Sequence, residues 1–327
     1  MKLPSLKRFL QSEAGAVVLW AMFALLGAAI LAPWFHMWGK QLAEAAAQGE
    51  LSPTLEWLGA ACDRAKLERF FNRAMMLVAL GLLPLLIARV RSLRRDNPAP
   101  IMGLQPTAAG RAVVQIVCGV IIAGGILWAT GMLLLELGAY RPMAKEVAAS
   151  VLIKKALVPA VIASLLEEWL FRGLVLGLWL RTTTPLRACI GSALLFSFLH
   201  FLKPPGDIAD PNHALSGFLL LANILGHFAQ PEFFVTDFLT LLIVGLILNW
   251  ARLRTGSLWF PIGLHAGWVL AFKAHNQLYY QPKQHWLQPW GIGESLRSGL
   301  VPLLALLLTA LICHYAMKLL CRKQLQA

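Results

Sequence analysis

Residues 156–180, ALVPAVIASLLEEWLFRGLVLGLWL, are long and apolar enough to form a helix that crosses a lipid bilayer. A helix rises about 1.5 Å per residue, so about 20 apolar residues span the hydrocarbon region. The same stretch carries three charged residues near its middle, Glu167, Glu168 and Arg172. A charged side chain is costly in hydrocarbon unless it is paired or hydrated. These residues therefore indicate a functional site inside a membrane helix.

The rest of the chain has the composition of a membrane protein. It has 327 residues, of which 58% are hydrophobic and only 14% charged, whereas soluble domains are about 25% charged. We interpret one further apolar segment, 213–230, as an interfacial or re-entrant helix because it contains His213, Asn223 and His227. We predict an all-α polytopic membrane protein with about eight transmembrane helices and an intramembrane active site. The eight expected spans are 16–35, 72–88, 112–137, 156–180, 187–203, 233–250, 257–275 and 299–318.

The basic residues predict membrane orientation rather than a nucleic-acid partner. The formal charge is +13, but lysine and arginine lie beside the apolar runs. With the N-terminus inside, the cytoplasmic segments hold 15 basic residues and only two acids, Glu13 and Asp96, whereas the external segments hold 12 of each sign. We expect both termini in the cytoplasm of a bacterial inner or plasma membrane, and no nucleic-acid partner. We also predict a single membrane domain, 1–327, with N-terminal spans in 1–140.

The spacing of the three charged residues predicts how they pair. Glu168 and Arg172 are four residues apart, so they share one helix face and can form an ion pair. Glu167 is rotated about 100° around the helix and faces a different neighbour. A structural ion pair that locks helix packing is the simpler alternative. The second carboxylate favours a functional site, because one arginine neutralises only one charge.

Two histidines lie in the fifth and the seventh predicted spans, His200 in 187–203 and His265 in 257–275. A single histidine in a span is more often structural than catalytic. Counted from the cytoplasmic helix ends, however, Glu167, His200 and His265 all lie roughly 16 to 20 Å deep. We therefore expect one acid and two imidazoles to meet in one layer of the membrane.

A carboxylate and two imidazoles can support two kinds of hydrolysis. In one, Glu167 accepts a proton from water with the aid of His200, while His265 donates to the oxyanion. In the other, the same three side chains bind one divalent metal, such as zinc, which makes its bound water more acidic. In both, Arg172 holds Glu168.

The chain resembles the CPBP family of intramembrane proteases, also called the CAAX protease and bacteriocin-processing or Abi family. The resemblance covers 156–275, which we predict as a CPBP-like catalytic core. It implies an intramembrane endopeptidase acting on a membrane-associated protein or peptide in the lipid bilayer, with no cofactor or with one divalent metal. Three motif blocks carry the resemblance: Glu167, Glu168 and Arg172 match Glu-Glu-x-x-x-Arg, Phe196 and His200 match Phe-x-x-x-His, and His265 begins the third block.

The resemblance also implies residue roles. It implies catalytic roles for Glu167, His200 and His265, which are also the ligands if a metal is used. The supporting residues are Glu168, Arg172 and Phe196.

The third block departs from the family pattern, because Val269 stands where Asn or Asp is expected. The resemblance implies that this position helps to bind the water or the oxyanion, which valine cannot do. Asn223, Asn249 and Asn276 are candidate substitutes. A catalytically weak immunity or scaffold protein of the same fold is therefore a second hypothesis. A third is a proton-coupled secondary transporter that uses the acids and histidines as a relay.

Overall fold

The computed structural model describes every residue except 1–9, 50, 95–101, 202–210, 294 and 323–327. The described chain is almost entirely helical, and its two short strands, β1 (Arg141–Pro142) and β2 (Tyr279–Tyr280), pair antiparallel. It divides into two compact units, 1–98 with 199–230 and 99–198 with 231–327. The single membrane domain stays a prediction. So does the cytoplasmic location of the termini, whose outermost residues lie outside the described ranges.

The described helices confirm an all-α polytopic membrane protein but not the expected count of about eight spans. The predicted span 187–203 is the helix α9 (Pro185–His200), which has only 16 residues. The predicted span 257–275 is α13 (Trp259–Leu278), in which His265, Lys273 and His275 reduce the mean hydropathy. Six described helical segments are long and apolar enough to cross a membrane: Glu13–Ala47, Leu67–Leu93, Ala109–Glu136, Ala149–Thr182, Pro231–Thr255 and Leu300–Lys318.

The first unit is built on two long helices that pack through small residues. A Cβ placed on Gly27 would lie 2.7 Å from Val78, so the glycine lets the two helices approach closely. His36 bonds through Nδ1 to Asn212 Oδ1 at 2.8 Å. The predicted interfacial segment 213–230 contains a helix of 12 residues. Its place in the bilayer stays a prediction. The helices of this unit are α2 (Glu13–Ala47), α3 (Pro53–Asp63), α4 (Leu67–Arg94) and α10 (Ser216–His227).

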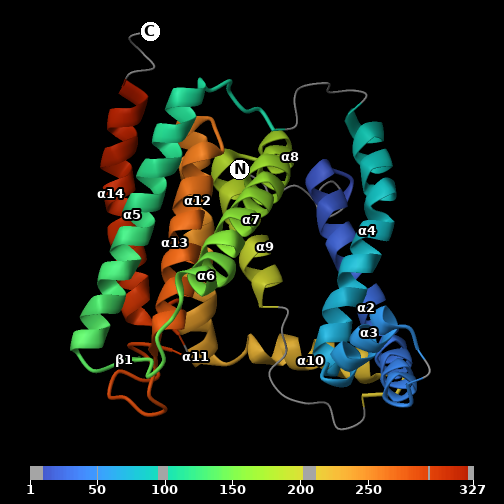
Figure 1. Cartoon of the computed structure of the whole chain (residues 1–327). Coiled ribbons are helices and arrows are strands. Elements are labelled where there is room, and N and C mark those ends of the chain that lie inside the picture. Colours follow the sequence, from blue (N-terminus) through green and yellow to red (C-terminus); the bar gives the residue numbers. More distant parts are fainter. Residues whose placement is uncertain (1–9, 50, 95–101, 202–210, 294, 323–327) are drawn as a thin grey trace. The chain divides into compact units, whose positions relative to one another are not determined.

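The second unit carries the first motif block, Phe196 and His265. Figure 1 labels most of the helices of this unit. The stretch 149–182, expected as a span from residue 156, begins earlier and includes two π-helical segments. In chain order the helical elements are α5 (Ala109–Glu136), α6 (Ala149–Leu152), η1 (Ile153–Leu157), α7 (Val158–Glu167), η2 (Glu168–Val175), α8 (Leu176–Thr182), α9, α11 (Pro231–Phe233), η3 (Phe234–Phe238), α12 (Leu239–Thr255), α13 and α14 (Leu300–Arg322).

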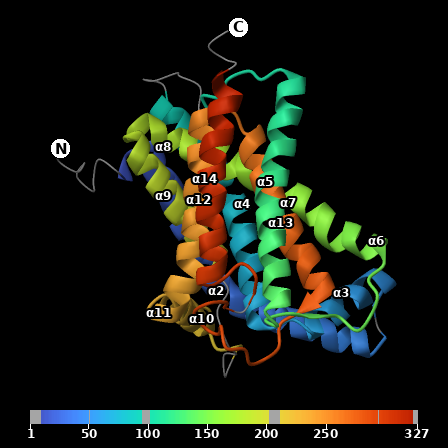
Figure 2. The same cartoon turned by 90° about the vertical axis from the view of Figure 1, so that its left-hand side faces the viewer.

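Helices α5 and α13 lie against each other along most of their length (Figure 2). Glycines on both helices line this contact. A Cβ on Gly119 would lie 2.6 Å from Leu264 N, and one on Gly267 would lie 2.7 Å from Val120 O. Real side-chain carbons do not approach backbone atoms so closely, so only glycine permits this crossing. The contact fixes the helix that carries His265.

Replacing Gly119 by alanine is expected to destabilise the protein by about 1–3 kcal/mol, because the added methyl group overpacks a backbone contact that cannot move aside. Gly125→Ala on the same helix is the matched control, since nothing lies within 4 Å of a Cβ there. Unfolding in detergent micelles measures both. Equal stability of the two variants would contradict the close helix approach.

Candidate active site

The site is built around the junction of α7 and η2, where Glu167 ends one element and Glu168 begins the next. The eight residues Glu168–Val175 form a π-helical segment. Such segments are rare inside α-helices and are frequent at functional sites. Within this segment Glu168 and Arg172 are both fully buried.

Arg172 and Glu168 form the predicted ion pair. Arg172 Nη1 donates to Glu168 Oε1 at 2.9 Å, and both side chains are 0% exposed. Arg172 Nη2 donates a long bond, 3.5 Å, to the carbonyl of Gly245 on α12. The guanidinium also lies over the ring of Phe196, 4.3 Å from its centroid, which adds a buried cation–π contact. The arginine thus joins η2 to α9 and α12.

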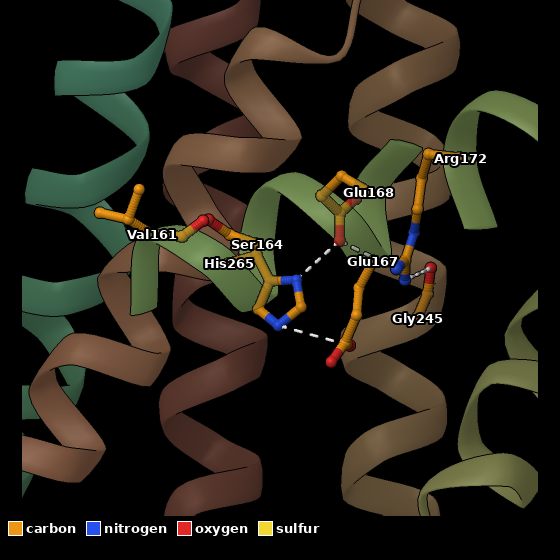
Figure 3. Close-up of polar contacts among 7 residues, drawn as sticks. All are labelled: Val161, Ser164, Glu167, Glu168, Arg172, Gly245 and His265. Atoms are coloured by element: carbon orange, nitrogen blue, oxygen red, sulfur yellow. Dashed lines mark hydrogen bonds and ion pairs between the residues drawn. The ribbon is translucent and has the colours of Figure 1, made fainter. Parts of the chain in front are cut away.

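His265 lies between the two carboxylates (Figure 3). Its Nδ1 is 2.7 Å from Glu168 Oε1, and its Nε2 is 3.8 Å from Glu167 Oε2. The first distance is a strong hydrogen bond, whereas the second is too long for one. A gap of this length between polar atoms is suited to a bridging water. Glu168 therefore fixes the imidazole through Nδ1, whereas Nε2 makes no direct hydrogen bond to Glu167.

The two carboxylates have different surroundings. Glu168 Oε1 accepts from both Arg172 and His265 and is sealed from solvent. The side chain of Glu167 is 31% exposed, although its Oε2 atom, which faces His265, is itself buried. Glu168 thus contacts His265 from a buried position, and Glu167 is the more exposed of the two carboxylates.

Two of the three predicted catalytic residues, Glu167 and His265, lie together in the structure. His200 is the last residue of α9 and belongs to the first unit, so its approach to Glu167 stays a prediction. Phe196 is 1% exposed, with its ring edge-on to His265 at 6.4 Å between centroids. The catalytic and supporting roles of all these residues stay predictions.

Some of this geometry was not foreseen from the sequence. The hydrogen bond from His265 to Glu168 joins residues 97 apart, and helical spacing gives no signal for such a pair. Gly245 has no side chain, so the sequence gives no sign that its carbonyl accepts a hydrogen bond from Arg172. The π-helical turn also has no clear sequence signature, although two adjacent acids in an apolar run indicate an unusual segment.

The candidates proposed to replace the missing amide at Val269 do not all lie in this unit. Asn223 is in α10 of the first unit. Asn249, on α12, donates through Nδ2 to the carbonyl of Cys189 at 2.8 Å, which ties its nitrogen to α9. Val269 itself is half-buried on α13, one turn beyond His265. A substitute for the family amide stays a prediction.

The metal-dependent alternative stays a prediction. Among the described residues no three His, Cys, Asp or Glu side chains converge into a group that could hold a metal ion. Glu168 Oε1 is already engaged by a guanidinium and an imidazole. The set predicted for a metal, Glu167, His200 and His265, includes a residue of the other unit and stays a prediction.

The comparisons with known proteins give one family. Residues 149–271 match the family model described as Type II CAAX prenyl endopeptidase Rce1-like. The comparisons found no match among curated proteins or among solved structures. The matched range contains all six residues singled out in the sequence: Glu167, Glu168, Arg172, Phe196, His200 and His265.

Proposed function

Since residues 149–271 belong to the CPBP or CAAX protease family, we propose that the protein is an intramembrane endopeptidase that uses Glu167 to activate water. Its substrate is a peptide bond in a membrane-associated protein or peptide. The protein is integral to the membrane. We propose a bacterial inner or plasma membrane with both termini in the cytoplasm, from the distribution of basic residues.

The observation that carries the proposal is the position of His265 between two unlike carboxylates. Glu168 is buried and bonded to His265 Nδ1, whereas Glu167 is partly exposed and 3.8 Å from His265 Nε2. A buried ion pair needed only for packing requires one carboxylate. The second, accessible carboxylate beside an oriented imidazole supports general acid–base chemistry.

Water activation is the first proposed step. A water molecule between Glu167 Oε2 and His265 Nε2 is within hydrogen-bond reach of both atoms. Glu167 removes one proton as the water oxygen attacks the carbonyl carbon of the scissile peptide. We propose that His200 helps to hold this water. These steps use no metal, and hydrolysis at a divalent metal held by Glu167, His200 and His265 is the alternative.

The next steps stabilise the oxyanion and transfer the proton from Glu167 to the leaving amine. In its doubly protonated form, His265 keeps Nδ1–H on Glu168 and donates Nε2–H to the oxyanion that develops on the former carbonyl oxygen. Glu167 then gives its proton to the amide nitrogen as the carbon–nitrogen bond breaks. The products are a carboxylic acid and a free amine; the acid then loses its proton to the surrounding water, and Glu167 is back in its starting state.

Arg172 supports these steps without contacting the substrate. Its guanidinium balances the charge of Glu168 in a fully buried place, so that Glu168 stays an acceptor for His265. Its contacts with Phe196 and with the carbonyl of Gly245 hold the π-helical segment against two other helices. Arg172 is therefore a positioning residue.

A catalytically weak immunity or scaffold protein is the second candidate function, and Val269 favours it. The family pattern has an amide or carboxylate one turn after the third-block histidine, and valine cannot bond to a water or an oxyanion. Such a protein would keep the site geometry and bind peptides while cleaving them slowly or not at all.

A comparison of membrane-peptide fragments tests the two functions. Cells that make the wild-type protein are expected to contain fragments that are missing from cells that make Glu167→Ala at the same level. Quantitative mass spectrometry of membrane peptides measures the difference. Glu136→Ala, at an exposed position of α5, is the control and should give the wild-type fragments. Identical fragments from wild type and Glu167→Ala would reject the protease and favour the scaffold.

A further inference from the structure

Helices α9 and α12 pack against each other between the candidate active site and the C-terminal end of α12, which carries Arg252. A Cβ on Gly245 would lie 3.0 Å from the Cβ of Ala193 and 3.4 Å from the ring of Phe196. One turn further along α12, Asn249 reaches the carbonyl of Cys189, one turn earlier on α9. The two helices therefore run antiparallel along this contact. Gly245 also accepts from Arg172, so the contact begins at the candidate site.

Buried polar atoms with no hydrogen-bond partner in the protein mark this interface. Ser192 Oγ and Asn249 Oδ1 are both on fully buried side chains and lack a protein partner. The same is true of Glu168 Oε2 and Arg172 Nε at the site end. At the other end Arg252 Nε also lacks a protein partner, on a side chain that is 6% exposed. Leaving a buried polar atom unpaired destabilises the folded protein. Native proteins satisfy such atoms with internal water.

These atoms form a row along the two helices. Asn249 follows Gly245 by four residues and precedes Arg252 by three, so all three share one face of α12. Ser192 lies three residues after Cys189 and beside Ala193, on the part of α9 that packs there. Arg252 donates to the carbonyl of Met102, in the segment before α5. The row thus runs from the basic end of α12 to Arg172 and Glu168.

We propose that internal water molecules occupy this row and supply the site with water from the end of α12 that carries Arg252. Asn249 and Ser192 bind these water molecules and act as positioning residues. The use of the water rests on the proposed hydrolysis, whereas its path rests only on the buried polar atoms. A hydrolase inside a membrane consumes one water for each bond cleaved, so a supply route through apolar packing has a direct chemical purpose.

Hydroxyl-radical labelling by radiolysis tests the path in the full-length protein without substrate. Radicals form from water in place, so a buried side chain next to internal water is oxidised although bulk solvent cannot reach it. Phe196 is 1% exposed and lies at the site end of the row. Phe260 is 0% exposed in the apolar cluster and is the matched dry reference. We expect Phe196 to be labelled several-fold faster than Phe260.

Asn249→Leu removes a polar group of the row, so it should exclude the internal water from this part of the interface. Labelling of Phe196 is expected to fall to the level of Phe260, and kcat for peptide cleavage should fall several-fold with KM unchanged. Thr309→Val is the control, because Thr309 is equally buried but its hydroxyl is already bonded within α14. If Asn249→Leu does not fold, Ser192→Ala is a smaller change with the same expected direction.

Each outcome decides the inference. Equal labelling of Phe196 and Phe260 in the wild type would overturn the water path. So would fast Phe196 labelling that neither Asn249→Leu nor Ser192→Ala reduces. Because the labelling needs no substrate, the path can be supported in a protein that cleaves nothing. In that case the proposed function fails and the hydrated interface remains.

Discussion

Glu167→Gln is expected to lower kcat for peptide cleavage by about 10²–10⁴-fold, because the amide cannot accept the proton of the attacking water. Glutamine keeps the length and shape of the side chain, so binding of the substrate should change little. Cleavage of a substrate identified from the membrane fragments measures kcat and KM separately. The purified variant should unfold at the wild-type temperature, since Glu167 is partly exposed and not part of the buried ion pair.

The matched control for this substitution is Glu136→Gln, which removes the same charge at an exposed position of α5. It should leave kcat unchanged. A Glu167→Gln variant that cleaves within twofold of the wild-type rate would remove Glu167 from the role of general base. The accessible carboxylate would then have to serve another purpose, such as the binding of a peptide or a cation.

Arg172→Leu is expected to destabilise the protein by about 3–5 kcal/mol, because it leaves the Glu168 carboxylate buried without its cation. It also removes the contacts with Phe196 and with the carbonyl of Gly245. Equilibrium unfolding in detergent micelles measures the change. Arg111→Leu, at an exposed position of α5, is the control and should cost less than 1 kcal/mol, as is usual for surface substitutions.

The double variant Arg172→Leu with Glu168→Gln separates the charge from the packing. Replacing both members of a buried ion pair with neutral groups often restores much of the stability that one substitution removes. We therefore expect the double variant to be more stable than Arg172→Leu alone. It should still be a poor enzyme, because a glutamine no longer offers His265 a charged acceptor. If the double variant is less stable than the single one, packing rather than charge determines the cost.

The sequence is most informative where charged residues stand inside apolar, membrane-spanning segments. The pair of Glu168 and Arg172 follows from a spacing of four residues, because that spacing brings two side chains to one helix face. The approach of Glu167 to His265 follows from equal depth in the membrane. Both expectations need only the helix rise and the cost of charge in hydrocarbon, and the structure has both contacts.

The remaining features depend on tertiary packing, which spacing does not encode. Depth alone does not decide which carboxylate His265 bonds to, because rotation of α13 about its axis is set by the glycines that face α5. The expected count of spans is not confirmed for a related reason. Helix α9 is shorter than a full span, and α13 carries several polar residues near the site and near its end. A functional interior lowers the apolar signal by which spans are recognised.

The glycine contact between α5 and α13 sets a lower limit on the part of the chain that can work alone. The family match begins at residue 149, yet the backbone of α13 rests on residues such as Ile116 and Val120, more than 25 positions earlier. A truncated chain starting at the match would lack the α5 backbone that packs against Gly263 and Gly267. Helix α13, which carries His265, would then lose its packing partner. The smallest part of the chain that keeps this site therefore has to include α5, although that helix contributes none of the site's charged side chains.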